Sequence, residues 1–311
     1  MTKALVVGGN GFIGSHLVDE LTQREWNVVV LDIQERRYEP MPASVHFIQG
    51  DLTQSYLVRE ALAGVDIVFH LAWATIHEVA NQDPAADVET NLIPSILLLK
   101  ACLQAEIKRF VFTSSGGTVY GQAKELPIAE IHPQNPINAY GVTKLALEKY
   151  LGMFNHLYDL DYVALRPSVP YGPRQNPLGR QGAVAVFLYR VAQGLPITLW
   201  GDGSVTRDYF YIADLVTALI AAAEQKLGVH RVFNIGGREE ISLLRLLQLA
   251  EETVGRKAIV DFQPGRSFDT TRLLLDTHLA EHELNWQPQV SLSNGLAQTW
   301  LWMSQTFDIY G

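Results

Sequence analysis

The chain has 311 residues, of which 48% are hydrophobic and 18% are charged, and its net charge is -9. This length allows one large domain or two of moderate size, and the composition is that of a folded protein. The excess of acidic over basic residues argues against a nucleic-acid-binding surface, which would need a basic face. An anionic ligand would therefore have to be held by a few placed arginines or by helix N-termini.

Cysteine content and the first residues bear on the compartment. The lone Cys102 excludes an internal disulfide and a cysteine-based zinc cluster, and it fits a reducing compartment. The start "MTKALVVGGNG" leads directly into a predicted strand rather than a signal peptide. No apolar run approaches the roughly 18 residues needed to span a bilayer. We therefore expect a cytoplasmic protein with no metal, no nucleic-acid partner and no membrane partner.

The first half of the chain alternates short apolar runs with segments of helical spacing. Buried strands that alternate with helices indicate a parallel sheet covered on both faces. The sequence therefore predicts an α/β fold with a Rossmann-type, doubly wound parallel sheet. The predicted strands lie at 3–9, 27–32, 45–51, 65–72 and 109–115, and the first predicted helix lies at 12–24.

The pattern loosens after the apolar run at 161–168. A Pro/Gly-rich loop at 169–182 is followed by shorter predicted strands and by two predicted helices at 241–255 and 291–303. We interpret this half as a smaller, interleaved C-terminal lobe that binds the substrate. The predicted division assigns 1–168 and 206–236 to a cofactor domain, and 169–205 and 237–311 to the substrate lobe.

The stretch "GGNGFIG" at 8–14 is the strongest local signal. Its glycines follow a strand and open a helix, which is the context that the dinucleotide-binding fingerprint requires. Gly8 permits the tight turn, Gly11 lets a pyrophosphate approach the backbone, and Gly14 allows close packing of helix on strand. A turn without a ligand is the alternative, and the strand–turn–helix context argues against it.

The choice between NAD and NADP depends on the end of the second strand. Asp32 follows Gly14 by 18 residues, close to the roughly 20 expected for an acid that binds the ribose hydroxyls. Its carboxylate would repel a 2′-phosphate, whereas the nearby Arg36 and Arg37 leave NADP open. The sequence favours NAD.

The order of the motifs along the chain resembles one enzyme family. "GDLT" (50–53), "HLA" (70–72), "TSS" (113–115) and Tyr-x-x-x-Lys (140–144) follow the glycine turn as in the extended short-chain dehydrogenase/reductases. "YGPRQ", "GDGSVTRDYFYIADL" and "RVFNIGG" in the second half resemble the nucleotide-sugar epimerase and dehydratase branch, which includes the UDP-glucose 4-epimerases.

The resemblance implies a set of cofactor-binding residues. Trp73 departs from it, because small residues are usual at that place in the family. The residues implied to line the cofactor site, besides the three glycines and Asp32, are Phe12, Ile13, Asp51, Leu52, Leu71, Ala72, Asn91, Tyr140, Lys144, Pro167 and Ser168.

Tyr140 and Lys144 lie one helical turn apart and so share a helix face. A phenol has a pKa near 10, but a neighbouring ammonium and a nicotinamide cation both favour the phenolate, so Tyr140 could accept a proton from a substrate hydroxyl. Lys144 would also hold the nicotinamide ribose. Ser115 is the expected third catalytic residue, which bridges Tyr140 and the sugar oxygen, and Ser114 and Thr118 are weaker candidates. The spacing alone fits a snorkelling helix edge equally well.

The residues after Ser115 bear on the type of reaction. Related dehydratases carry an Asp–Glu couple there, and related decarboxylases a glutamate, whereas this chain reads "GGTVYG". Without an added acid or base, oxidation and reduction at one carbon remain, and we expect NAD-dependent epimerisation of a nucleotide sugar, of the UDP-sugar 4-epimerase type. A net NAD(P)-dependent reductase or dehydrogenase of the same family and a non-catalytic NAD-binding protein are the alternatives.

Substrate contacts follow from the resemblance. Arg207 and Arg266, both in sequence that reads as loops, stand where the family places contacts to the diphosphate, and Ser115 and Tyr140 would contact the sugar. Val169 replaces an asparagine of the family motif "RxxNxYGP", which leaves the identity of the sugar open. A homodimer is the expected assembly.

Overall fold

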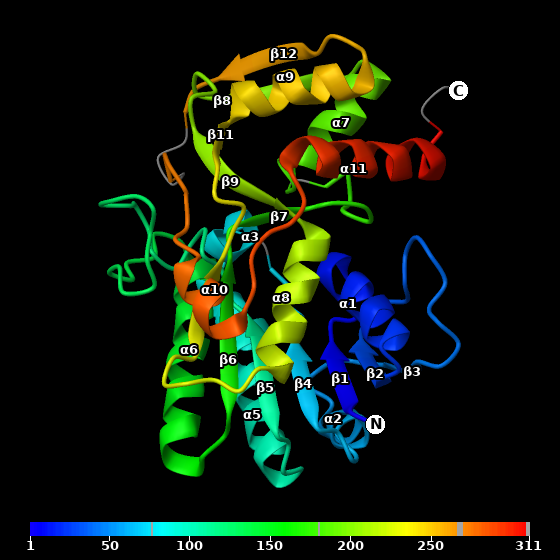
Figure 1. The fold of residues 1–311 in the computed structure, drawn as a ribbon, viewed down its shortest axis with the longest axis vertical. Helices are drawn as coiled ribbons and strands as arrows, with labels where there is room; N and C mark the ends of the chain where they lie inside the picture. The colour runs from blue at the N-terminus through cyan, green and yellow to red at the C-terminus, as the bar shows by residue number, and fades with distance from the viewer. Residues whose placement is uncertain (76, 180, 266–269, 309–311) are drawn as a thin grey trace.

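The computed structural model describes residues 1–75, 77–179, 181–265 and 270–308. A seven-stranded sheet with the order β10-β6-β5-β4-β1-β2-β3 forms its centre, and every pairing in it is parallel (Figure 1). This confirms the predicted doubly wound Rossmann-type sheet. Its strands are β1 (Lys3–Val7), β2 (Asn27–Asp32), β3 (His46–Gln49), β4 (Ile67–His70), β5 (Arg109–Thr113), β6 (Tyr162–Pro167) and β10 (Val232–Ile235).

The alternation of side chains along the strands creates two apolar layers. Ala4 and Val6 of β1 face one layer, Leu5 and Val7 face the other, and all four are buried. Both faces must therefore be covered, as the continuous apolar strands predict. The first layer contains α1 (Phe12–Gln23) and α8 (Ile212–Glu224), and the second contains α2 (Ser55–Ala61), α5 (Ile93–Gln104) and α6 (Ala139–Tyr158).

The connection from β4 to α5 is built from short helical pieces. A π-helical turn in this connection places Asn91 inside the protein, where the residue is 4% exposed. The sequence analysis did not predict this turn. The pieces are α3 (His77–Gln82), α4 (Pro84–Asp87) and the π-helix η1 (Val88–Leu92).

The second lobe lies beyond the carboxyl ends of the large sheet (Figure 1). Its strands form one three-stranded and one two-stranded sheet, and α9 packs on α7 and α11. β9 lies within the range predicted for the cofactor domain but pairs with β7 and β11. The elements are β7 (Val169–Tyr171), α7 (Ala183–Gln193), β8 (Pro196–Trp200), β9 (Thr206–Tyr211), β11 (Glu240–Ser242), α9 (Leu243–Val254), β12 (Ile259–Gln263) and α11 (Leu292–Thr306). The helix α10 (His278–Leu284) instead packs against β10 and α8 of the cofactor side (Figure 1).

The strand register brings the ends of the strands together. Val7 pairs with His70, His70 pairs with Phe112, and Thr113 pairs with Leu165. The residues that follow β1, β4, β5 and β6 therefore meet at one edge of the sheet, where ligands of open α/β folds bind.

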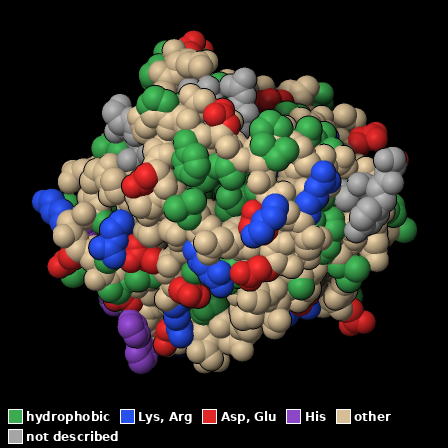
Figure 2. Space-filling view, turned by 90° about the horizontal axis from the view of Figure 1, so that it is seen from above, with side chains coloured by type: hydrophobic (Ala, Val, Ile, Leu, Met, Phe, Trp, Pro, Cys, Tyr) green, Lys and Arg blue, Asp and Glu red, His purple; other side chains and the backbone are tan. Residues whose placement is uncertain are grey.

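The outer surface of the second lobe carries mixed charges. Figure 2 looks onto this end of the molecule and shows acidic, basic and hydrophobic side chains intermixed.

Within the described residues, no helix is both long and apolar enough to cross a bilayer.

Candidate active site

The glycine turn after β1 is shaped by close backbone contacts. Gly8 has φ +83°, and a Cβ on it would lie 2.7 Å from the amide nitrogen of Ala72. A Cβ on Gly14 would lie 2.1 Å from the carbonyl oxygen of Gly8, so both positions need glycine to form the turn. A Cβ on Gly11 would meet nothing closer than 3.4 Å. The protein does not itself require glycine there, which fits the predicted approach of a pyrophosphate.

The turn also leaves the N-terminus of α1 open to an anion. The helix begins at Phe12 and Ile13, and no side chain caps it at Gly11. The first amide groups of a helix lack intrahelical partners and favour negative charge. A cofactor pyrophosphate therefore fits this cradle.

Asp32 lies at the end of β2, next to the glycine turn. Its carboxylate accepts hydrogen bonds from the amide groups of Asn10 (2.9 Å) and Gln34 (3.0 Å), which fix it beside the turn. Arg36 is turned away, because its guanidinium donates to the carbonyl oxygen of Ser15 and to Asp19. Arg36 is thus already occupied, and this arrangement favours NAD over NADP.

Two predicted cofactor contacts come directly after β4. The amide groups of Leu71 and Ala72 both donate to the carbonyl oxygen of Val7 at 3.0 Å, so this loop closes over the turn after β1. Asp51 and Leu52 follow β3, and the Asp51 carboxylate accepts from the amide of Thr53 at 2.7 Å. The structure therefore brings the predicted residues of three strand ends to the same edge of the sheet.

Asn91 is held by a buried polar cluster. Its side-chain oxygen accepts from the amide of Ala74 (2.7 Å), and its side-chain nitrogen donates to Asp87 (2.9 Å) and to Thr75 (2.9 Å). Asp87, which is fully buried, also accepts from the hydroxyl of Thr143 at 2.6 Å. The Asn91 side chain thus ties the loop after β4 to α6 through Asp87.

Tyr140 and Lys144 lie on the first two turns of α6. The helix starts there because the Asn138 side chain accepts from the amide of Gly141 at 2.8 Å, an N-cap that the sequence "NAYG" favours. The Lys144 ammonium donates to the carbonyl oxygen of Thr113 at 2.8 Å and lies 5.5 Å from the ring centroid of Tyr140. The pair is therefore held at the carboxyl end of β5.

The structure distinguishes the three candidate hydroxyls near this pair. Ser114 donates to Glu148 and is buried, so its hydroxyl is already occupied. Thr118 is 3% exposed. Ser115 is half-buried, so it is the most exposed of the three. Ser115 is thus the accessible hydroxyl at the strand end, as the sequence analysis expects.

Burial shifts the pKa of both helix residues. It lowers the pKa of Lys144 to about 7, while the charges of Asp87 and Glu148 act in the opposite direction. The phenol of Tyr140 also loses water contact, which raises its pKa, and the charge of Asp87 raises it further. The protein alone therefore keeps Tyr140 protonated, and the phenolate needs positive charge close to the ring.

A buried polar network below the site was missed by the sequence analysis. Glu148 forms a two-point ion pair with Arg166, with Nε–Oε1 at 3.0 Å and Nη2–Oε2 at 2.5 Å. Arg166 donates onward to the hydroxyl of Tyr120 (2.8 Å), which donates to Asn234 (2.7 Å). No local spacing signals this network, because its members come from separate parts of the chain and meet only in the folded protein.

The predicted residues after β6 lie at the same edge of the sheet. The carbonyl oxygen of Pro167 accepts from the amide of Gly116 at 2.9 Å, and the amide of Ser168 donates to the carbonyl oxygen of Ile235 at 2.8 Å. These bonds connect the end of β6 to the loop that carries Ser115 and to β10.

The two predicted phosphate-binding arginines have different outcomes. Arg207 lies in β9 and not in a loop, because residues 206–208 pair with β11. Its guanidinium donates to the carbonyl oxygens of Thr206 (2.8 Å) and Thr270 (2.9 Å). Asp208, the alternative ion-pair partner, is fully buried and accepts from the amide of Gly237 at 2.6 Å. Arg266 lies outside the described residues.

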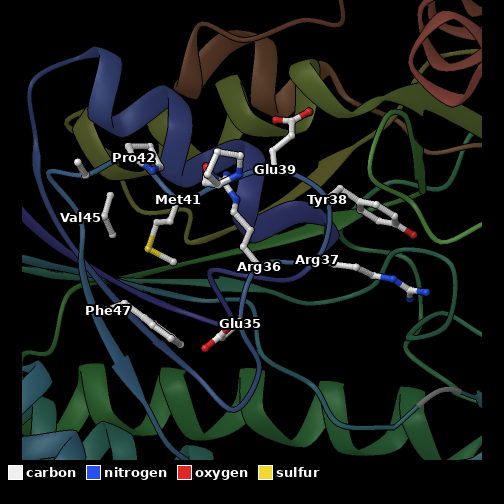
Figure 3. A pocket seen from close by; sticks show the side chains of 11 residues that line it. Glu35, Arg36, Arg37, Tyr38, Glu39, Met41, Pro42, Val45 and Phe47 are labelled. Carbon is white, nitrogen blue, oxygen red and sulfur yellow. The ribbon is translucent and has the colours of Figure 1, made fainter. Parts of the chain in front are cut away.

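A cavity of about 590 Å³ lies in the loop between β2 and β3, away from Tyr140 (Figure 3). Arg174, which follows β7 in the second lobe, pairs with Glu39 of this loop. Arg174 also pairs with Asp19 of α1 at 2.7 Å. The ring of Tyr38 also packs on Trp302 of α11 at 5.1 Å. The loop therefore connects the cofactor side to the second lobe.

The fold and the site define a dinucleotide-dependent enzyme of the short-chain dehydrogenase/reductase type. The sequence model of the NAD dependent epimerase/dehydratase family matches residues 4–236, and the chain belongs to this family. The family assignment confirms NAD as the cofactor.

Three similar proteins illustrate the range of the family. The chain is 36% identical to UDP-glucose 4-epimerase of Mycolicibacterium smegmatis over 96% of its length and 97% of the relative. It is 31% identical to dTDP-4-dehydro-6-deoxyglucose reductase of Escherichia coli, over 94% of each chain. The crystal structure of UDP-glucose 4-epimerase with UDP-glucose from Thermotoga maritima has a TM-score of 0.93 and 35% identity, covering 98% of this chain and 99% of that one.

Proposed function

We propose that the protein epimerises a nucleotide sugar, a UDP-sugar, at C4. One observation supports this proposal: Lys144, one helical turn after Tyr140, bonds to the carbonyl oxygen of Thr113 at the end of β5, two residues before Ser115, and residues 116–121 that follow Ser115 include no acid or histidine. A Cβ on Gly116 would lie 2.5 Å from Leu275 and 2.8 Å from the carbonyl oxygen of Arg166, so no carboxylate side chain fits there. This favours oxidation and reduction over elimination or decarboxylation.

In the proposed reaction, Tyr140 accepts the proton of the sugar 4-hydroxyl and later returns it. Ser115 bridges the phenol and the sugar oxygen, and Lys144 holds the nicotinamide ribose and supplies positive charge near the ring. NAD, when bound, takes the hydride from C4 and gives it back. The keto sugar turns over between the two steps, so hydride returns to the opposite face and no net oxidation occurs.

Binding of the nucleotide diphosphate is assigned to Arg207 and Arg266, because a guanidinium offers paired donors to phosphate oxygens. We further propose that the substrate lobe comprises the predicted ranges 169–205 and 237–311 together with β9, which pairs with β7 and β11. We also propose that NAD contacts the residues that the family resemblance implies. These are Gly8, Gly11, Phe12, Ile13, Gly14, Asp32, Asp51, Leu52, Leu71, Ala72, Asn91, Tyr140, Lys144, Pro167 and Ser168.

The proposal is tested by incubating the protein with a panel of UDP-sugars and separating the products. An epimer keeps the mass of the substrate, and NADH does not accumulate. Tyr140→Phe keeps the ring packing but removes the proton acceptor, so turnover should fall by roughly 10²–10⁴-fold while the protein stays folded. A product lighter by water or carbon dioxide, or full turnover by Tyr140→Phe, would contradict the assignment.

A second candidate function is the net reduction of a 4-keto nucleotide sugar. The similarity to the reductase of Escherichia coli favours it, and the same Tyr140 and Lys144 would serve as proton donor and ribose ligand. Val169, in place of the asparagine of related epimerases, is half-buried at the start of β7. Stoichiometric consumption of NADH with a 4-keto sugar, and no epimer from a UDP-sugar, would identify the reductase.

We also propose that the protein forms a homodimer through α5 and α6, which pack side by side. Their outer faces carry apolar side chains at i and i+4 spacing, an arrangement that favours burial against another helix pair. Light scattering tests this assembly, and a monomer at micromolar concentration would contradict it. The exposed apolar residues on these helices are Ile93, Leu97, Met153, Leu157 and Tyr158.

A further inference from the structure

Trp73, the residue that departs from the usual family pattern, lies directly against the Lys144 side chain. The ammonium nitrogen of Lys144 is 3.9 Å from the centroid of the indole ring, compared with 4.8 Å for Phe112 and 5.5 Å for Tyr140. The indole also meets the Tyr140 ring edge-on, at 6.1 Å between centroids and 74° between planes. Trp73 therefore contacts both members of the proposed catalytic pair.

The indole lies on the α5–α6 side of the sheet. It packs against the apolar layer that contains Phe112 and Leu147, and its ring is 6.1 Å from the Phe112 ring. The glycine turn forms the connection from β1 to α1, and its Gly8 lies against Ala72, the residue before Trp73. Trp73 thus reaches Lys144 from the segment that follows β4.

The buried ammonium has few other partners. Lys144 is 3% exposed, and its ammonium donates a hydrogen bond to the carbonyl oxygen of Thr113. Within the described residues, no carboxylate lies at ion-pair distance: Asp87 is bonded to Thr75, Asn91 and Thr143, and Glu148 to Arg166 and Ser114. An ammonium removed from water is attracted to the negative face of an aromatic ring, and an indole face attracts it most strongly.

We infer that Trp73 is a positioning residue of the active site, whose indole face keeps the Lys144 side chain charged and pressed against Tyr140. The inference rests on the proposed function only in taking Lys144 as the residue that holds the ribose and polarises Tyr140. Trp73 acts through the position and charge of Lys144 and through its edge-on contact with the Tyr140 ring.

The consequence for pH follows from the groups around the ammonium. Burial lowers the pKa of Lys144 to about 7, and Asp87 on α4 and Glu148 on α6 counteract this. Tyr140 is neutral near pH 7 because its pKa is raised, and His70 on β4 is neutral because burial lowers its pKa to about 3. Replacing the indole by an aliphatic side chain should lower the pKa of Lys144 further, by about one unit for an attraction of this kind.

The test compares Trp73→Leu with Trp73→Phe, which keeps a ring face, in the NAD-free protein. The folded state of Trp73→Leu should give up the Lys144 proton at lower pH than that of the wild type. Its unfolding equilibrium constant, relative to wild type, should therefore be about fivefold larger at pH 6 than at pH 8.5, which corresponds to about 1 kcal/mol. Trp73→Phe should show at most a third of this pH effect, and Trp73→Met serves if Trp73→Leu does not fold.

Lys144→Met provides the control. In this background, Trp73→Leu should lower stability equally at both pH values, because the titrating group is gone. The inference would be overturned if Trp73→Leu, in the protein that retains Lys144, lost the same stability at both pH values. Trp73 would then be only a packing residue. The measurement needs neither substrate nor cofactor, so this failure would leave the proposed epimerase function intact.

Discussion

The buried ion pair between Glu148 and Arg166 gives the sharpest prediction about stability. Both side chains are 2% exposed, and the two bonds between them measure 2.5 and 3.0 Å. Glu148→Gln keeps the size and shape of the side chain but leaves the Arg166 charge buried without a counter-charge. The glutamine oxygen can still accept from the Ser114 hydroxyl, whereas the new amide nitrogen replaces the oxygen that accepts from Arg166 Nη2.

The expected cost follows from the burial of the charge. Removing one partner of a buried pair destabilises a protein by about 3–5 kcal/mol, which is a large part of a typical total of about 5–15 kcal/mol. Glu20→Gln is the matched control, because the pair of Glu20 with Arg24 is 35% and 42% exposed. Exposed pairs one helical turn apart contribute about 0.3–0.5 kcal/mol, so the control should be close to neutral.

Urea unfolding at pH 7.5 measures both variants, and an unchanged m-value shows that the comparison is valid. Replacing both Glu148 and Arg166 by Met should recover much of the loss, because no unpaired charge remains. A loss below about 1 kcal/mol for Glu148→Gln would show that Arg166 reaches water, and the reasoning from burial would then be wrong.

Three further predictions concern the cofactor side. Asp32 should make the protein bind NAD more tightly than NADP, with the difference reduced in Asp32→Ala, and tighter NADP binding by calorimetry would contradict the ribose assignment. Gly14→Ala should lower the free energy of unfolding by about 1–3 kcal/mol or more, because the backbone must move. Gly11→Ala should change the free energy of unfolding by no more than about 1 kcal/mol but should weaken NAD binding. Equal unfolding midpoints for the two variants would contradict this prediction. Arg174→Ala should lower the free energy of unfolding by about 1.5–3 kcal/mol, because charge-assisted hydrogen bonds are lost. Arg245→Ala is the control, because its pair with Glu252 is exposed, and it should change the stability little. Thermal unfolding should therefore show a lower midpoint for Arg174→Ala than for Arg245→Ala.

The sequence alone determined the class of fold and predicted where the cofactor would bind. Apolar strands that alternate with helices require a sheet covered on both faces, and the glycines of "GGNGFIG" allow backbone contacts that the structure shows at Gly8 and Gly14. These features are local or periodic along the chain, so they can be recognised before the chain is folded. The order of the motifs then identified the family, which the comparisons confirmed.

Only the tertiary structure decided which groups surround the catalytic pair. Trp73 and Lys144 are 71 positions apart in the sequence, so their contact is not visible in it. The sequence around Arg207 predicts a loop, but the residue lies in β9. The sequence does not give a physical reason to prefer Ser115 over Ser114. The structure gives one, because the Ser114 hydroxyl donates to Glu148. Contacts of this kind depend on strand register and helix packing, because burial and pairing are properties of the assembled chain and not of its neighbouring residues.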